Sequence, residues 1–141
     1  MSGDFFGKAV IVTGAGSGIG RAAAILFAQA GAGVLCFDVT GDVEDAVRTI
    51  SDAGGTALAM IGDAGTEADV RAAVAEALAR FGRLDVFFAN AGITGGVRGG
   101  FFDATPEVWA EVLRVNLIGP FLAIKHAAPA IRDSGGGAIV C

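Results

Sequence analysis

Short apolar runs alternate with segments of helical character along the whole chain, and this alternation limits the fold more than any other feature. The runs predicted to be strands are Ala9–Val12, Val34–Phe37, Ala57–Ile61, Leu84–Ala89 and Ala138–Cys141. The segments predicted to be helices are Arg21–Ala30, Asp42–Ala53, Thr66–Gly82 and Pro106–Arg132. Strands alternating with helices form a parallel sheet with right-handed crossovers and helices on both faces. We therefore expect one α/β domain over residues 1–141.

Composition and charge exclude several classes of protein. With 10 Lys and Arg against 15 Asp and Glu, the net charge is −5, so we expect no nucleic-acid partner. We find no secretory signal and no apolar stretch near the roughly 18 residues of a membrane span, so we expect a cytoplasmic protein without a membrane partner. A single histidine predicts no metal site. Cys36 and Cys141 are predicted to be buried free thiols in a reducing compartment.

A glycine-rich loop, Thr13–Gly20, follows the first predicted strand and leads into a helix. Gly14, Gly18 and Gly20 allow a sharp turn and a close approach of the backbone to a ligand. The free N–H groups at the start of the following helix would face an anion, most simply a pyrophosphate. The alternative is a turn that only permits close helix packing.

The second predicted strand ends in an acidic residue at an informative distance from this loop. Asp38 lies 24 residues after Gly14. A carboxylate at about that distance accepts hydrogen bonds from a ribose 2′-hydroxyl in dinucleotide folds, and it would repel a 2′-phosphate. The alternative is a solvated loop aspartate. Taken together, the loop and Asp38 predict a dinucleotide site that prefers NAD.

At four places the sequence resembles the short-chain dehydrogenase/reductase family. The matching segments are Thr13-Gly14-x-x-x-Gly18-x-Gly20, Asp63, Asn90-Ala91-Gly92 and Val115-Asn116-Leu117. The resemblance covers about residues 5–141 and implies a Rossmann-type doubly wound sheet of strand order 3-2-1-4-5. The cofactor-binding residues it implies are Thr13, Gly14, Ser17, Gly18, Ile19, Gly20, Asp38, Asp63, Ala64, Asn90, Ala91 and Gly92. In the family, the acid matched by Asp63 meets the adenine amino group, and the asparagine matched by Asn116 is catalytic.

The resemblance also implies an activity, with one departure from the family pattern. Members transfer a hydride between a nicotinamide cofactor, here NAD because Ser17 is neutral, and an alcohol or carbonyl substrate. A homo-oligomer is expected. However, the family's serine and its Tyr-x-x-x-Lys lie beyond the fifth strand, and this sequence contains no tyrosine. We therefore expect an incomplete, cofactor-binding half that binds NAD without turnover.

Two other functions stay open at this point. One is a nucleotide-binding module without catalysis. The other is a methyltransferase that binds S-adenosylmethionine, because Gly14–Gly18 also matches a G-x-G-x-G loop. Against it, no acid precedes the glycines, and such enzymes lack the segment Asn90-Ala91-Gly92.

Some local signals can be checked against a structure. Asp42, Thr66 with Asp69, and Thr105 are predicted to cap helices. Pro120 lies inside the long helix and lacks an N–H, which predicts a kink at Gly119-Pro120 and a free Asn116 carbonyl. His126 is expected to be packed or exposed, and Arg98 to be solvated rather than in contact with substrate.

Overall fold

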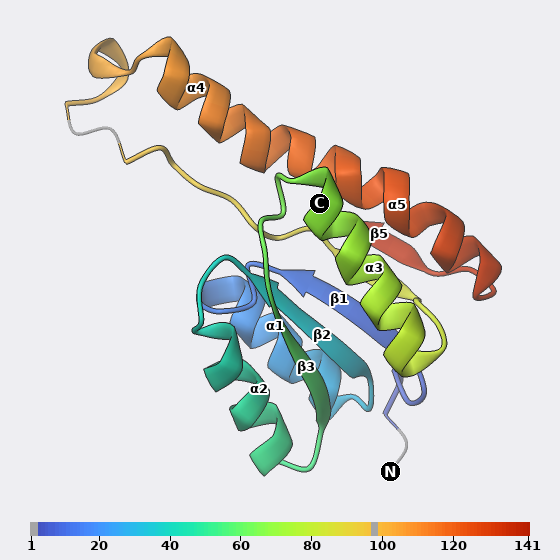
Figure 1. The fold of residues 1–141 in the computed structure, drawn as a ribbon. Helices are drawn as coiled ribbons and strands as arrows, with labels where there is room; N and C mark the ends of the chain where they lie inside the picture. The colour runs from blue at the N-terminus through green and yellow to red at the C-terminus, as the bar shows by residue number, and fades with distance from the viewer. Residues whose placement is uncertain (1–2, 97–98) are drawn as a thin grey trace.

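The computed structural model describes residues 3–96 and 99–141, which contain one five-stranded parallel sheet (Figure 1). Its strands are β1 (Ala9–Thr13), β2 (Gly33–Asp38), β3 (Thr56–Ile61), β4 (Val86–Phe88) and β5 (Ala138–Val140). Their order across the sheet is β3-β2-β1-β4-β5. The predicted Rossmann-type order 3-2-1-4-5 is therefore confirmed. Arg98 lies outside the described residues.

Helices lie on both faces of the sheet (Figure 1). The α-helices are α1 (Gly18–Gln29), α2 (Val43–Asp52), α3 (Glu67–Phe81), α4 (Pro106–Leu113) and α5 (Gly119–Asp133). A short 3₁₀ turn, η1 (Phe101–Asp103), precedes α4, and a π-helical segment, η2 (Arg114–Ile118), joins α4 to α5.

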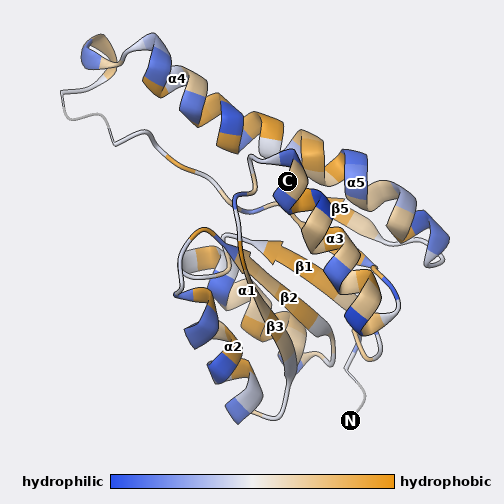
Figure 2. Cartoon of the chain, in the orientation of Figure 1, coloured by the Kyte–Doolittle hydropathy of each residue, from blue (hydrophilic) through white to orange (hydrophobic). Residues whose placement is uncertain are grey.

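Side chains of the central strand, β1, alternate between two buried layers, one on each face of the sheet. Ile11 of β1 belongs to one buried cluster with Val70 of α3 and Leu122 of α5. The next residue, Val12, belongs to the other cluster, with Ala24 of α1. Because successive side chains of a strand point to opposite faces, a strand covered on both faces is largely apolar, as Figure 2 shows for β1.

The register of the sheet brings several loops together at one edge. Thr13 of β1 is aligned with Phe37 of β2, and Val12 with Phe88 of β4. The loops that follow these parallel strands therefore leave the sheet together at the carboxyl ends of the strands, on either side of β1. The strand order reverses there, which is where open α/β sheets bind ligands.

Only one of the three predicted caps forms as expected. The Thr105 side chain accepts a hydrogen bond from the N–H of Val108 at 3.3 Å. Asp42 and Thr66 cap nothing with their side chains, so those two predictions are wrong. Asp42 already has a helical backbone, and Asp69 instead accepts a hydrogen bond from the N–H of Asp63 at 2.9 Å. A tertiary contact therefore replaces the predicted capping box.

The predicted long helix contains a π-helical segment directly before Gly119-Pro120, and the kink expected there stays a prediction. In η2 the N–H of Gly119 donates to the carbonyl of Arg114, five residues back, instead of to the usual residue four back. The extra residue in this turn lies directly before Pro120. A π-turn absorbs the missing N–H of the proline without ending the helix. That the Asn116 carbonyl is free stays a prediction.

The prediction for the cysteines is half right. Cys36 is a buried free thiol, and burial raises its pKa to about 12. Cys141 is exposed, because it follows β5 at the edge of the sheet, so its predicted burial is wrong. Within residues 3–96 and 99–141, no helix has both the length and the apolar character to cross a membrane. The same residues contain no cluster of three or more potential metal ligands.

Candidate functional site

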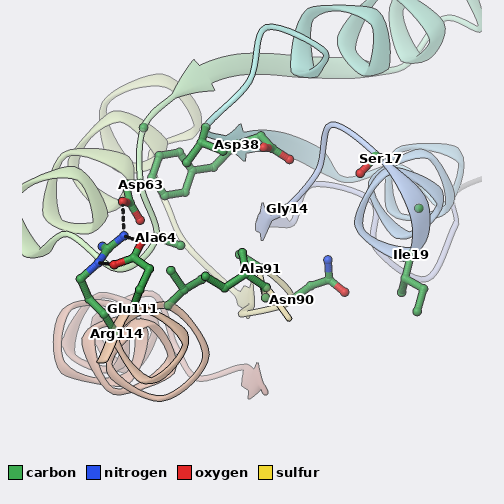
Figure 3. Close-up of a pocket in the computed structure, with 17 residues that line it drawn as sticks. Gly14, Ser17, Ile19, Asp38, Asp63, Ala64, Asn90, Ala91, Glu111 and Arg114 are labelled. Atoms are coloured by element: carbon green, nitrogen blue, oxygen red, sulfur yellow. Dashed lines mark hydrogen bonds and ion pairs between the residues drawn. The ribbon is translucent and has the colours of Figure 1, made fainter. Parts of the chain in front are cut away.

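A cleft of about 600 Å³ opens where the loops after β1 to β4 meet the α4–η2 segment (Figure 3). Ten of the twelve residues predicted to bind the cofactor line it: Gly14, Ser17, Gly18, Ile19, Asp38, Asp63, Ala64, Asn90, Ala91 and Gly92. The structure therefore brings together segments that are up to 78 residues apart in the sequence. Thr13, Gly20 and Asn116 do not line the cleft.

The glycine loop has its shape for two separate reasons. Gly14 has φ of +68°, a left-handed conformation that residues with a side chain rarely adopt. Gly20 lies so close to the loop that a Cβ there would overlap the carbonyl oxygen of Gly14. Gly20 therefore sets how tightly α1 packs beneath the loop, although it does not line the cleft itself.

Asp38 joins the end of β2 to the glycine loop. Its Oδ2 accepts a hydrogen bond from the N–H of Gly16 at 2.8 Å, and its Oδ1 accepts one from the N–H of Thr40 at 3.3 Å. A carboxylate has about four lone-pair positions, so acceptor capacity remains for a ligand in the cleft. Sequence spacing identified Asp38 but not its bond to Gly16, which depends on a contact across 22 residues.

Thr13 and Asn90 tie the end of β1 to the loop after β4. The Asn90 side-chain amide donates to the carbonyl of Thr13 at 3.1 Å. The hydroxyl of Thr13, which is almost fully buried, accepts from the N–H of Ala91 at 3.0 Å. Thr13 therefore holds the cleft wall from behind, while Asn90 and Ala91 form part of its surface.

An ionic group closes the β3 side of the cleft (Figure 3). Arg114 Nη2 lies 2.7 Å from Asp63 Oδ2 and 2.8 Å from Glu111 Oε1. The hydrogen bond from Arg114 is the main reason that the pKa of Asp63 lies below its ordinary value. Conversely, Glu111 and then Asp63 raise the pKa of Arg114 above its ordinary value. Both carboxylates are therefore ionised at neutral pH.

Arg114 and Glu111 were not predicted as site residues. Their spacing of three residues on a helix was a signal for an ion pair with each other. The partner that places Arg114 in the cleft, Asp63, is 51 residues away and gave no such signal.

Asn116, the predicted catalytic residue, lies next to the cleft, and its side-chain amide makes two hydrogen bonds with Ile93. Its Oδ1 accepts from the N–H of Ile93, and its Nδ2 donates to the carbonyl of Ile93, both at 2.8 Å. The amide therefore fastens the segment after β4 to η2. His126 contacts Glu67 at 2.9 Å on the side of α5 that faces α3, away from these residues.

Comparison with known proteins shows the family. The short chain dehydrogenase model matches residues 8–141, and the chain belongs to this family. Momilactone A synthase of Oryza sativa subsp. japonica is 40% identical over 95% of this chain and 48% of its own length. Cyclohexanol dehydrogenase of Acinetobacter sp. (strain SE19) is 40% identical over 99% of this chain and 56% of its own length.

Solved structures agree in fold. A short chain dehydrogenase from Mycobacterium paratuberculosis bound to NAD has a TM-score of 0.89 and 30% identity, over 97% of this chain and 55% of that one. A 3-ketoacyl-ACP reductase from Sinorhizobium meliloti 1021 has a TM-score of 0.86 and 42% identity, over 93% and 51%. The chain spans about half the length of the relatives it matches.

Proposed function

We propose that this cleft binds NAD(H), as the cofactor site of an oxidoreductase that transfers a hydride between the nicotinamide and an alcohol or carbonyl carbon. The observation that carries the proposal is the bond between Asp38 and Gly16, which sets a side chain able to accept hydrogen bonds from a ribose directly beside the glycine loop. The similarity to a short chain dehydrogenase bound to NAD and to cyclohexanol dehydrogenase supports it.

Residues that line the cleft are suited to each part of a dinucleotide cofactor. The first N–H groups of α1 have no partner inside the helix, and the first turn of α1 carries no acidic residue that would repel a pyrophosphate. Asp38 would accept hydrogen bonds from the adenosine ribose. Asp63 and Ala64 would lie along the base. The loop Asn90–Gly92 would lie along the nicotinamide half.

Bound NAD would supply the site that accepts or releases the hydride, while the chain's own residues bind and orient it. We propose Asn116 as a catalytic residue of the family's proton-transfer machinery. Because its side-chain amide is paired with Ile93, its contribution falls to its backbone carbonyl. The 141 residues contain no tyrosine, so we propose that they bind the cofactor without supplying the tyrosine that acts as general acid and base in the family.

The wider biology is proposed on the same basis. Relatives include a cyclohexanol dehydrogenase and a borneol dehydrogenase, which supports a small alcohol or carbonyl compound as substrate. We propose a homo-oligomer, because apolar side chains such as Trp109, Leu117 and Phe121 are exposed along α4, η2 and α5. The buried free thiol of Cys36 supports a reducing, cytoplasmic setting.

Calorimetric titration of the purified protein with NADH and with S-adenosylmethionine tests the proposed cofactor. We expect saturable, one-site binding of NADH and no heat of binding with S-adenosylmethionine. Failure to bind NADH would contradict the proposal, and saturable binding of S-adenosylmethionine would favour the methyltransferase alternative. A non-catalytic nucleotide-binding module would bind NADH as well, so the gene is also sequenced downstream of the codon for Cys141, where a Tyr-x-x-x-Lys motif would favour the oxidoreductase.

A further inference from the structure

The loop that follows β3 is fixed by hydrogen bonds from three sides. The backbone N–H of Asp63 donates to Asp69 Oδ2 of α3 at 2.9 Å. Within the loop, Asp63 Oδ1 accepts from the N–H of Gly65 at 2.7 Å. On the third side, Asp63 Oδ2 accepts from Arg114 Nη2 of η2 at 2.7 Å. The carboxylate therefore has one defined orientation at the cleft wall.

The π-helical segment packs against this loop at two points. A Cβ on Gly65 would overlap the guanidinium of Arg114, so this glycine makes room for the side chain. Five residues after Arg114, where α5 begins, a Cβ on Gly119 would lie 3.1 Å from the carbonyl oxygen of Ala64. Arg114 is thus held by close backbone packing as well as by its ion pairs.

The charges of this group do not cancel. Glu111 binds Arg114 through both carboxylate oxygens, to Nε and Nη2, each at 2.8 Å. One guanidinium therefore serves two ionised carboxylates, which leaves a net charge of −1 at this end of the cleft. Negative charge alone would favour a hydrogen-bond donor there even without Arg114, so what Arg114 adds is the orientation of the Asp63 carboxylate.

The position of Asp63 indicates which part of a dinucleotide it would meet. Both Asp38 and Asp63 line the cleft, and they follow neighbouring strands, β2 and β3. If the adenosine ribose is at Asp38, the base extends toward β3 and Asp63. Two hydrogen bonds occupy about half of the acceptor capacity of the Asp63 carboxylate, and the remainder is available to a donor on the base.

We infer that Arg114 is a positioning residue that makes this site discriminate a purine with a 6-amino group from one with a 6-oxo group. By holding the Asp63 carboxylate in one orientation, Arg114 aims an acceptor at the exocyclic amine of adenine. A 6-oxo purine presents an acceptor to the same carboxylate and is repelled. This inference rests on the proposed binding of NAD(H).

The test compares two reduced cofactors whose purines differ at C6 and at the adjacent N1, which carries a proton in the 6-oxo base: NADH and nicotinamide hypoxanthine dinucleotide in its reduced form. The wild-type protein should bind NADH about tenfold more tightly, which corresponds to one charge-assisted hydrogen bond. Arg114→Gln should lower the affinity for NADH about fivefold or more, while the affinity for the hypoxanthine analogue changes by less than about twofold. If Arg114 positions Asp63, the ratio of the two affinities should therefore be smaller in Arg114→Gln than in the wild type.

Two further variants separate positioning from folding. Arg114→Lys keeps a charge beside Asp63 but loses the fork that also reaches Glu111, so it should retain part of the preference. If circular dichroism shows that Arg114→Gln does not fold, the base preference is measured on Arg114→Lys instead. Arg132→Gln is the matched control, because Arg132 is an exposed arginine on α5 that pairs with Asp133 outside the cleft. It should leave both affinities unchanged.

Each outcome decides the inference. A smaller base preference in Arg114→Gln, with partial recovery in Arg114→Lys, supports it. Equal loss of affinity for both cofactors assigns Arg114 a merely structural role and overturns it. So does a wild-type protein that binds both cofactors equally or prefers the 6-oxo base, although the proposed function then stands. A wild-type protein that binds neither cofactor refutes the proposed function and the inference together.

Discussion

At the scale of single residues, the buried carboxylate of Asp85 joins the start of β1 to the loop that precedes β4. It accepts hydrogen bonds from the N–H of Ala9 at 2.9 Å and from two nitrogens of Arg83 at 2.6 and 2.7 Å, and it pairs with Lys8 at 3.2 Å. Burial by itself would raise the pKa of Asp85. The bonds from Arg83, Ala9 and Lys8 outweigh it and hold that pKa below the ordinary value of 3.8.

Asp85→Ala is therefore expected to destabilise the fold by about 1–3 kcal/mol at neutral pH, because a buried N–H and two cations lose their acceptor. A group with a lowered folded pKa stabilises the protein above its unfolded pKa, and this contribution is lost as the pH falls through the folded value. Urea unfolding of wild type and variant should thus converge below about pH 4. Asp133→Ala is the control, since the exposed pair with Arg132 should cost less than about 1 kcal/mol. A constant difference down to pH 2 would contradict this account.

Gly20→Ala tests whether the packing of α1 beneath the glycine loop is required. The added methyl group would overlap the carbonyl of Gly14, so the loop must move. We expect the free energy of unfolding, measured by urea titration, to fall by roughly 1–3 kcal/mol. The affinity for NADH, measured by calorimetric titration at the same temperature, should also be weaker. The control is Gly41→Ala, where a Cβ meets nothing within 4 Å. If Gly20→Ala binds NADH like the control, this explanation of the loop is wrong.

At the scale of elements, the junction between α4 and α5 carries a prediction about the Asn116 carbonyl. Pro120 has no N–H to donate to it, and η2 has already shifted the bonding pattern by one residue. In a high-resolution crystal structure we expect this carbonyl to accept from a water molecule or a polar side chain. A bond from the N–H of Phe121, the next donor along the π-turn, would contradict the prediction.

The elements themselves were largely predictable, because each signal for them is local. Continuous apolar runs marked every strand, and Thr105-Pro106 marked the start of α4. The capping box at Thr66 was wrongly predicted and the role of Arg114 was missed, because each depends on a contact outside its own helix. Asp69 binds the N–H of Asp63 instead of capping its own helix, and Arg114 reaches Asp63 across 51 residues. Strand-end positions therefore predicted most of the cleft, but not the ionic group that closes it.

At the scale of the whole molecule, exposed apolar surface predicts self-association of the 141-residue chain. A groove of about 360 Å³ between α1 and the β4–β5 edge is lined by apolar side chains, including Leu26, Phe88 and Val140. Exposed apolar patches and open sheet edges favour association. Sedimentation velocity should show oligomers or aggregates. A monomer with a high melting temperature would contradict the expectation.

The same chain should bind the cofactor and yet show no oxidation of alcohols with NAD, because it contains no tyrosine. General acid and base catalysis contributes roughly 10²–10⁴-fold to rate, so activity should fall below detection. A spectrophotometric assay of NADH formation with cyclohexanol or borneol measures this. Reproducible turnover would show that another group in the chain supplies the proton transfer.

The central claim is that Asp38 makes this cleft a site for NAD(H), and paired titrations with NADH and NADPH test it most directly. The wild-type protein should prefer NADH by at least about tenfold, because the carboxylate accepts the ribose hydroxyls and repels a 2′-phosphate. Asp38→Asn removes the charge but keeps an amide oxygen for Gly16, and Asp38→Ser removes the charge and leaves only a shorter hydroxyl, so the preference should shrink in each variant. Equal affinities for the two cofactors in the wild type, or an unchanged preference in both variants, would contradict the account.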